Sequence, residues 1–291
     1  MSYASYDDER RELGYGPMGG GGANWKMRLI LAAMIALVSI ISFYSMTTEN
    51  PITGEHQRVG MSEDQEIAMG LQAAPQMEQE HGGLSPNPAA RATVDRVGER
   101  ILAALNKSLR EQHRENPYPF KFHLLNDPKT VNAFALPGGQ VFITTGLYKL
   151  LETEGQLAGV LGHEIGHVLS RHGAQQLAKQ QLTQGLAGAA GMAGGDRNAA
   201  QIAAQVGALV NMKYGRGAET EADKWGVKLA AEAGYDPRAM IGVMQILDKA
   251  SGDGGPPEFL STHPKPANRI QYIKTVIQKE FPNGVPAGLE P

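Results

Sequence analysis

The chain has no cysteine among its 291 residues. Disulfide bonds, thiolate metal sites, a cysteine nucleophile and lipid attachment to a cysteine are therefore all excluded. Any bound metal ion must be held by histidine, aspartate or glutamate side chains. The chain could work in an oxidising compartment without thiol chemistry, although the absence of cysteine does not by itself place it there.

The sequence also lacks a charge excess of either sign. Lys and Arg total 27 and Asp and Glu total 30, which gives a formal net charge of −3. A balance of this kind gives no indication of nucleic-acid binding, so we expect no nucleic-acid partner. No segment of 20–50 residues repeats along the chain, which argues against a repeat architecture.

Only one hydrophobic run is long enough to cross a membrane. It lies in residues 25–45 and carries no charge after Arg28, and twenty residues at ~1.5 Å each span ~30 Å. Lys26 and Arg28 lie at its start, whereas no Lys or Arg follows it before Arg58. The positive-inside rule therefore predicts a single-pass anchor with a cytoplasmic N-terminus and the following domain on the periplasmic or extracytoplasmic side. A cleaved signal peptide is the alternative, but no A-x-A-like site follows the run.

The remaining segments indicate one folded domain between irregular ends. The N-terminal arm is polar and Gly-rich, and helical periodicity begins at a capping-box pattern, Ser62 with Gln65 three residues later. The predicted divisions are a disordered arm (1–24), a transmembrane anchor (25–45), a linker (46–60), a folded domain (61–282) and a loose tail (283–291).

Within the folded domain the pattern is mainly helical. An apolar face predicts a long helix over 89–114, and the stretches FKFHLL, VNAFALPGG and QVFITT predict short strands with a tight turn at 137–139. The Ala/Gly/Gln-rich segment 174–210 is either a mobile connection between helices or a segment that touches the membrane or gates a site. We expect an α+β fold, mostly helical, with a small β-sheet.

The stretch VLGHEIGHVLSRHG places titratable groups in an otherwise apolar helix. His163 and His167 are separated by four residues, so they project ~40° apart from one face and can reach a single ion. Glu164 flanks the pair, where it can reach a water in the site but is poorly placed to bind the metal. This His-Glu-x-x-His pattern is the zinc-peptidase signature. His172 projects ~180° from His163, so we interpret it as a surface residue.

A catalytic zinc takes three protein ligands, so a third must come from elsewhere in the chain. In the stretch GRGAETEADKWG, Glu219 and Asp223 are also four residues apart and share a helix face. Glu219 would be the third ligand, and Asp223 would accept a hydrogen bond from a ligand imidazole. The alternative is a solvated acidic stripe that includes Glu221.

The helix that carries the histidine pair is unusually rich in glycine, a poor helix former. We interpret these glycines as positions where another backbone or a substrate approaches the helix closely. They are Gly155, Gly159, Gly162 and Gly166.

Together these stretches resemble a family of zinc metallopeptidases, the gluzincins that include the CAAX prenyl proteases, the HtpX heat-shock proteases and periplasmic quality-control proteases. The chain carries one hydrophobic span in place of a multi-span bundle, so it is most similar to the single-anchor or periplasmic members. The similar stretches, in chain order, are EIAMGLQAAPQM, VNAFALPGGQVFITTGLYKLL, LAGVLGHEIGHVLSRHG, YGRGAETEAD and STHPKPANRI.

The resemblance implies a zincin-like domain with the small sheet beside the His-Glu-x-x-His helix, and one zinc ion per chain. It implies His163, His167 and Glu219 as zinc ligands, Glu164 as catalytic base and Asp223 as the residue behind the ligands. The expected activity is that of a membrane-anchored zinc metalloendopeptidase acting on misfolded or unfolded protein segments, in envelope protein quality control. The sequence does not indicate an oligomeric state.

Further residues are candidates for transition-state or substrate contacts. Tyr214, Arg216, Asn132 and His263 could each stabilise the oxyanion or contact substrate. His263 has a second possible role, which we favour: it could occupy the open position of zinc and hold the enzyme inactive, as the resemblance to some relatives with a histidine in this motif implies. The third possibility is a surface loop histidine.

Peptide binding is expected along the hairpin that contains VNAFALPGGQVFITT, by strand addition, and the alternative is that this hairpin is ordinary core sheet. The main alternative function is a chaperone-like binding protein with a latent or structural zinc site. A membrane-tethered scaffold without metal is the third hypothesis, and it fails if zinc co-purifies with the chain.

Overall fold

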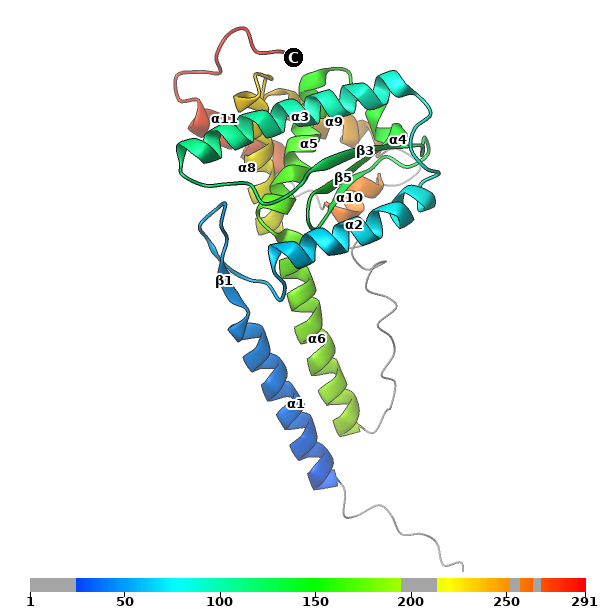
Figure 1. The fold of residues 1–291 in the computed structure, drawn as a ribbon, viewed down its shortest axis with the longest axis vertical. Coiled ribbons are helices and arrows are strands. Elements are labelled where there is room, and N and C mark those ends of the chain that lie inside the picture. Colours follow the sequence, from blue (N-terminus) through cyan, green and yellow to red (C-terminus); the bar gives the residue numbers. More distant parts are fainter. Residues whose placement is uncertain (1–24, 195–213, 252–256, 264–267) are drawn as a thin grey trace, which may run out of the picture. The chain divides into compact units, whose positions relative to one another are not determined.

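The computed structural model forms two units, which are described separately: Met1–Ile41 with Leu182–Ala200, and Ser42–Gln181 with Gln201–Pro291. The predicted disordered arm (1–24) lies outside the described part of the chain, as does much of the predicted connection after residue 194. Figure 1 traces the described elements in chain order. The described residues are 25–194, 214–251, 257–263 and 268–291.

The first unit contains most of helix α1 (Trp25–Ser45) and the distal half of helix α6 (His172–Gly194). Helix α1 has a mean hydropathy of 2.1 and is long and apolar enough to cross a membrane, by length and composition. Ala32 is its only buried residue, and most of its large apolar side chains are exposed. Because α6 extends to Gly194, the first part of the predicted connection 174–210 is regular helix.

The second unit begins with a hairpin where we predicted a linker. Strands β1 (Thr47–Glu49) and β2 (His56–Arg58) pair antiparallel within residues 46–60. The Asn50 side chain donates to the Leu169 carbonyl at 2.8 Å, and Gln57 donates to the Ser170 carbonyl at 3.0 Å. This segment therefore caps the carbonyl end of the histidine helix, a long-range contact that local composition does not reveal.

A three-stranded sheet lies between two helices. Strands β3 (Lys121–Leu125), β4 (Ala133–Leu136) and β5 (Gln140–Thr144) have the order β3-β5-β4, with β3 parallel and β4 antiparallel to β5. Helix α3 (Pro88–Glu111) covers one face and α2 (Glu63–Glu80) covers the other (Figure 1). The predicted long helix, short strands and capping box at Ser62 are confirmed.

The remaining helices surround α5 (Glu154–Leu169), whose residues from Gly155 onward are all buried. A Cβ at Gly162 would lie 3.2 Å from the Gly226 Cα, and one at Gly166 would lie 3.2 Å from the Ala222 Cα. The prediction that these glycines admit another backbone is thus confirmed. The other helices are α4 (Thr145–Tyr148), α8 (Arg216–Glu232), α9 (Ala239–Ala250), α10 (Glu258–Thr262) and α11 (Arg269–Glu280).

The C-terminal tail, expected to be loose, packs on this unit. The backbone of Glu290 exchanges hydrogen bonds with the segment after α8: its N–H donates to Gly234 and its carbonyl accepts from Asp236. The Glu290 carboxylate forms an ion pair with Arg100 at 2.7 Å. The Pro291 carbonyl accepts from the Gly155 N–H at 2.9 Å, which satisfies a free donor in the first turn of α5.

Candidate metal centre

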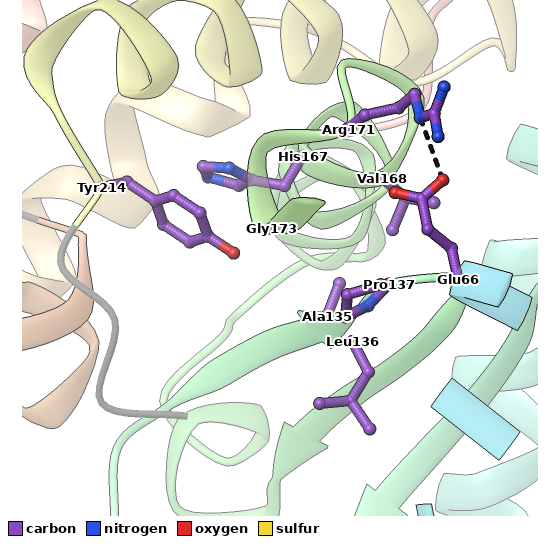
Figure 2. Close-up of a pocket in the computed structure, with 9 residues that line it drawn as sticks. All are labelled: Glu66, Ala135, Leu136, Pro137, His167, Val168, Arg171, Gly173 and Tyr214. Carbon is purple, nitrogen blue, oxygen red and sulfur yellow. Dashed lines mark hydrogen bonds and ion pairs between the residues drawn. The ribbon is translucent and has the colours of Figure 1, made fainter. Parts of the chain in front are cut away.

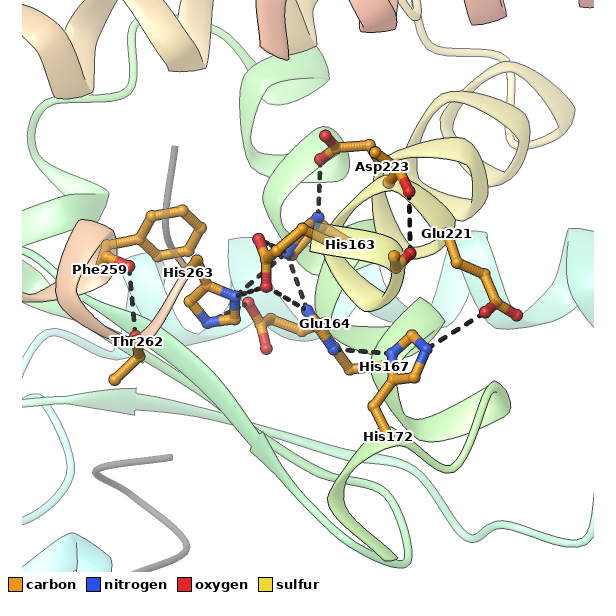
Figure 3. A network of polar contacts seen from close by, with 12 residues as sticks. His163, Glu164, His167, His172, Glu221, Asp223, Phe259, Thr262 and His263 are labelled. Atoms are coloured by element: carbon orange, nitrogen blue, oxygen red, sulfur yellow. Dashed lines mark hydrogen bonds and ion pairs between the residues drawn. The ribbon is translucent and has the colours of Figure 1, made fainter. Parts of the chain in front are cut away.

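Helices α5 and α8 bring the predicted ligand side chains together in the interior of the second unit. The Nε2 atoms of His163 and His167 lie 3.1 Å apart, as expected for residues on successive turns of one helix face. Glu219, in the first turn of α8, places carboxylate oxygens 3.7 Å from His163 Nε2 and 3.5 Å from His167 Nε2. All three side chains are buried, and Figure 3 shows His163 and His167 within the network of polar contacts.

Asp223 lies behind this cluster, one turn along α8 from Glu219. Its Oδ1 accepts a hydrogen bond from His163 Nδ1 at 3.0 Å, which leaves His163 Nε2 directed at the cluster. Burial favours the protonated carboxyl, but the charge of Arg269 and the His163 hydrogen bond hold the pKa of Asp223 below its usual value.

Arg269 is a buried residue that sequence reasoning did not identify. Its guanidinium pairs with both oxygens of Asp223, at 2.9 and 2.7 Å, and lies 3.1 Å from Glu219 Oε2. It thus fixes two carboxylates of α8 from the first residue of α11. Arg269 lies in the stretch STHPKPANRI, which carries part of the family resemblance. That resemblance was the signal in the sequence that could have identified Arg269 as a site residue.

His172 is not the surface residue that helical projection predicted. It is buried, and its Nδ1 lies 2.9 Å from His167 Nδ1 while its Nε2 lies 3.2 Å from Glu221 Oε2 (Figure 3). Helix α5 ends at Leu169 and Arg171 has a positive φ of 53°, so the regular rotation of 100° per residue stops before His172. Glu221 is accordingly a partner of His172 and not a fully solvated residue.

Glu164 is enclosed without a hydrogen-bond partner among the described residues. Both carboxylate oxygens are buried without a hydrogen bond, and Oε1 lies 3.6 Å from His263 Nε2, an ion pair when that ring is protonated. Burial raises the pKa of Glu164 above the usual carboxyl value. A buried carboxylate without a hydrogen bond is costly, so the position of Glu164 beside the histidine cluster is a feature that structural stability does not explain.

His263 follows the short helix α10 and joins the same cluster. Its Nδ1 lies 3.1 Å from Glu219 Oε1 and 3.3 Å from His163 Nε2, and its ring stacks on Phe259 at 4.5 Å between centroids. The side chain is buried, which contradicts the alternative of a surface loop histidine.

The remaining candidates differ in how closely they approach the metal cluster. The Tyr214 ring stacks on His167 at 4.1 Å between centroids, and burial raises the pKa of its hydroxyl. Asn132 is buried and donates to Glu258 Oε1 at 3.2 Å, on α10. Arg216 is exposed at the start of α8 and takes part in none of the described hydrogen bonds or ion pairs of the cluster.

The donor set fits a metal ion. One atom from each of His163, His167, Glu219 and His263 can be chosen so that all four lie within 4.8 Å of one another. Ligand atoms ~2.0–2.1 Å from a tetrahedral ion lie about 3.3–3.4 Å apart, close to the 3.1 Å between the two Nε2 atoms. Glu219 Oε2 is also buried and makes no hydrogen bond of good geometry within the described residues, although the Arg269 guanidinium forms an ion pair with it at 3.1 Å. These residues thus supply the nitrogen and oxygen ligands that zinc takes in catalytic sites.

A small pocket connects this cluster to the edge of the sheet. It is lined by Ala135, Leu136 and Pro137 at the end of β4, and by His167 and Tyr214 (Figure 2). Strand β4 is an edge strand of the sheet, so its outer backbone groups have no strand partner there. At the far wall an Arg171–Glu66 ion pair of 2.9 Å joins the end of α5 to α2.

Comparison with known proteins agrees with this geometry. Residues 88–277 match the model of peptidase family M48. The beta-barrel assembly-enhancing proteases of Yersinia pestis and Escherichia coli are 35% and 31% identical over 76% and 83% of this chain, covering 45% and 50% of their own lengths. The mitochondrial metalloendopeptidase OMA1 of Schizosaccharomyces pombe is 31% identical over 77% of this chain and 64% of its own length. The chain thus spans about half the length of several curated relatives that it matches, and it belongs to peptidase family M48.

Proposed function

We propose that the chain is a membrane-anchored zinc metalloendopeptidase that cleaves unfolded or misfolded polypeptides in envelope protein quality control. Family membership and relatives named as proteases and metalloendopeptidases support this activity. The observation that carries the proposal is Glu164, a buried carboxylate that makes no hydrogen bond within the described residues and lies beside the cluster of His163, His167 and Glu219. A structural metal site has no need of such a residue.

His163, His167 and Glu219 would hold one zinc ion, with Asp223 and Arg269 fixing the ligands from behind. Bound zinc supplies Lewis acidity and lowers the pKa of water to about 7. Glu164 accepts a proton from the attacking water and delivers it to the leaving amine. Its raised pKa brings its proton affinity closer to working pH, which favours general acid–base catalysis.

Tyr214 is the candidate that the geometry favours as an oxyanion donor. It stacks on His167, and the raised pKa of its hydroxyl keeps it protonated at neutral pH. Asn132, at the start of β4, is better placed for substrate than for the oxyanion because its amide bonds Glu258. Arg216 is too exposed to act inside the cluster, and its proposed role is a rim contact with substrate.

His263 would hold the enzyme in an inactive state. Its Nδ1 lies beside Glu219 and His163, where a fourth ligand would block access of water to the site. The segment that follows it begins with Pro264, which limits the backbone conformations of His263. Activation would require α10 and His263 to move away from Glu164.

Substrate would bind as an added strand along β4. This strand is a sheet edge, and the pocket at its end leads to His167 and Tyr214. Strand addition reads the backbone more than the side chains, which suits unfolded segments of varied sequence.

Helix α1 would anchor the chain with its N-terminus in the cytoplasm and the catalytic unit on the periplasmic or extracytoplasmic side. Its length and hydropathy suit one membrane span. Lys26 and Arg28 at its first turn are the basis for the orientation.

Three proteins test this function: wild type, Glu164→Gln and Glu219→Ala. Zinc per chain is measured by mass spectrometry, and hydrolysis is followed with casein. We expect one zinc in wild type and in Glu164→Gln, hydrolysis only in wild type, and loss of zinc in Glu219→Ala. Equal zinc in all three proteins would remove Glu219 from the site. Casein binding without cleavage by zinc-loaded wild type, combined with unfolding on chelation, would favour the chaperone-like alternative.

A further inference from the structure

A second hollow lies on the far edge of the sheet from β4, between the outer edge of β3 and the first turns of α3. Its volume is about 330 Å³, within the range of ligand-binding pockets. None of its lining residues belongs to the metal cluster. The lining residues that bear on ligand binding include Leu84, Arg91, Asp95, Lys121 and Phe122.

The backbone of β3 is only half paired along this edge. Lys121 N–H donates to the Gly139 carbonyl, so alternate residues face β5 and Phe122 and Leu124 face outward. The Leu124 carbonyl accepts from Ser85 N–H at 2.8 Å, and the chain then turns away at the Pro86 position. In the described structure, no backbone group pairs with the N–H of Leu124 or with either outward group of Phe122.

The side chains around the open part of this edge carry charges that form no ion pair within the described residues. Arg91 Nε is buried without a hydrogen-bond partner, and its guanidinium forms no ion pair within the described residues. Asp95, one turn along α3, does not pair with it, and the exposed Lys121 adds a second positive charge. Leu84 is 40% exposed and supplies an apolar wall. The hollow therefore offers backbone pairing, apolar contact and a guanidinium that lacks an anion.

We propose that this hollow is a second polypeptide-binding site, in which an acidic, extended segment of substrate pairs with the outward backbone groups of Phe122 and the N–H of Leu124 and places a carboxylate against Arg91. Backbone addition to a sheet edge and a bidentate carboxylate–guanidinium contact are complementary in geometry and charge. The site rests on the proposed function for the identity of its occupant, an unfolded protein substrate. It would hold one segment of a long substrate while another segment reaches the metal centre.

Binding is tested with the full-length Glu164→Gln protein, so that no probe is cleaved. The probes are fluorescein-labelled, unstructured twelve-residue peptides whose two central residues are both Glu, both Gln or both Lys. We expect the Glu peptide to bind at least tenfold more tightly than the Gln peptide. Arg91→Glu should abolish that preference and favour the Lys peptide. Lys107→Glu, the same charge change on an exposed position of α3, should leave the preference within twofold of the parent protein.

A second variant keeps the test decisive if Arg91→Glu fails to fold, as judged by circular dichroism. Leu84→Asp places a carboxylate in the same hollow and should also weaken the Glu peptide at least tenfold. Equal binding of Glu and Gln peptides, or preference unchanged in both hollow variants, would overturn the inference. Because only binding is measured, a failure here leaves proteolysis by wild type untouched. Conversely, lack of proteolysis in wild type would contradict the proposed function without altering these affinities.

Discussion

His263 contacts both the proposed ligands and the proposed base, so its replacement discriminates between two opposite roles. If it blocks the metal site, His263→Ala should raise casein turnover several-fold and cause self-cleavage, because Glu164 would be freed from its neighbour at 3.6 Å. If it stabilises the oxyanion, turnover should fall about 10²–10³-fold. Activity and autolysis are followed on the same sample by gel electrophoresis. A strong fall would reject the inhibitory role, and no change would reject both.

His172 should act on the metal through His167. Its ring lies 2.9 Å from His167 Nδ1, so it orients the imidazole and fixes its tautomer. We expect His172→Ala to weaken zinc affinity about 10–100-fold, the usual cost of losing such a partner. Competition with a chromogenic chelator measures this affinity. Glu221→Gln keeps a polar partner for His172 and is the matched control, with a smaller expected loss; unchanged affinity in His172→Ala would make the contact merely structural.

The difference between His167 and His172 shows how far the sequence can define this site. His163, Glu164 and His167 lie within one regular helix, and Glu219 and Asp223 within another, so their spacing predicts which side chains converge. His172 lies beyond the end of α5, where spacing no longer gives direction. Arg269 lies on α11, whereas its partners Asp223 and Glu219 lie on α8. Residue spacing cannot predict this contact, because the two helices meet only in the folded chain.

At the scale of elements, the close packing of α5 on α8 should be sensitive to one methyl group. A Cβ at Gly166 would lie 2.6 Å from the Trp225 Cβ, so Gly166→Ala must push α8 away. We expect a destabilisation of about 1–3 kcal/mol, despite the ~1 kcal/mol that alanine gains in helix propensity. Zinc affinity should fall as well, because α8 carries Glu219.

Urea denaturation measures the stability of Gly166→Ala, and Gly188→Ala is the matched control. Gly188 is also inside a helix, but a Cβ there would meet nothing within 4 Å. The control should be neutral or slightly stabilising. Equal stability of the two variants would mean that α8 adjusts to the added methyl group without cost.

The contact between α2 and the end of α5 should make stability depend on pH. Burial raises the pKa of Glu66 to about 7, although Arg171 and Tyr118 oppose this shift. The folded state then retains a proton that the unfolded state loses above about 4.5, so this group's contribution falls as pH rises from about 4.5 to 7. We expect the stability of Glu66→Gln relative to wild type to increase between pH 5 and 7.5.

Urea midpoints at several pH values test the Glu66 prediction, with Glu63→Gln as control. Glu63 also pairs with Arg171, at 2.7 Å, but it is more exposed than Glu66. A relative stability of Glu66→Gln that stays constant across this range would contradict the raised pKa.

Elements were predictable from the sequence where their contacts are local. The apolar stripe of α3 and the capping box of α2 depend on neighbouring residues, and both were found. The β1–β2 hairpin and the tail depend on distant partners: Asn50 bonds Leu169, and Glu290 pairs with Arg100. Composition alone therefore predicted a linker and a loose end where the chain forms specific contacts.

At the scale of the whole molecule, the pocket beside Tyr214 and the hollow beside Arg91 lie at opposite edges of one sheet, β4 and β3. A long unfolded chain could engage both edges, whereas a short peptide could engage only one. We therefore expect Arg91→Glu to raise KM for casein several-fold with little change in kcat. Cleavage of a peptide of six residues should be unchanged, because a peptide that lies along β4 as an added strand has no residues left to pair with β3. An equal loss on both substrates would place the effect of Arg91 in the catalytic site.

The orientation proposed for the chain in a membrane rests on charges at one end of α1. Lys26 and Arg28 lie in its first turn, no acidic residue lies within it, and the next basic residue after it is Arg58. Since Lys and Arg near a span are retained in the cytoplasm, the N-terminus should be inside and Pro291 outside.

Alkaline phosphatase, which is active only outside the cytoplasm, should therefore be active when fused after Pro291, and a fused cytoplasmic reporter should be silent. Replacing Lys26 and Arg28 with Glu and adding two Lys after Ser45 should reduce or invert this difference, because the charge bias is then reversed. The opposite reporter pattern in the wild-type fusion would overturn the assignment, and a mature N-terminus near Ser45 would show a cleaved signal sequence in place of an anchor.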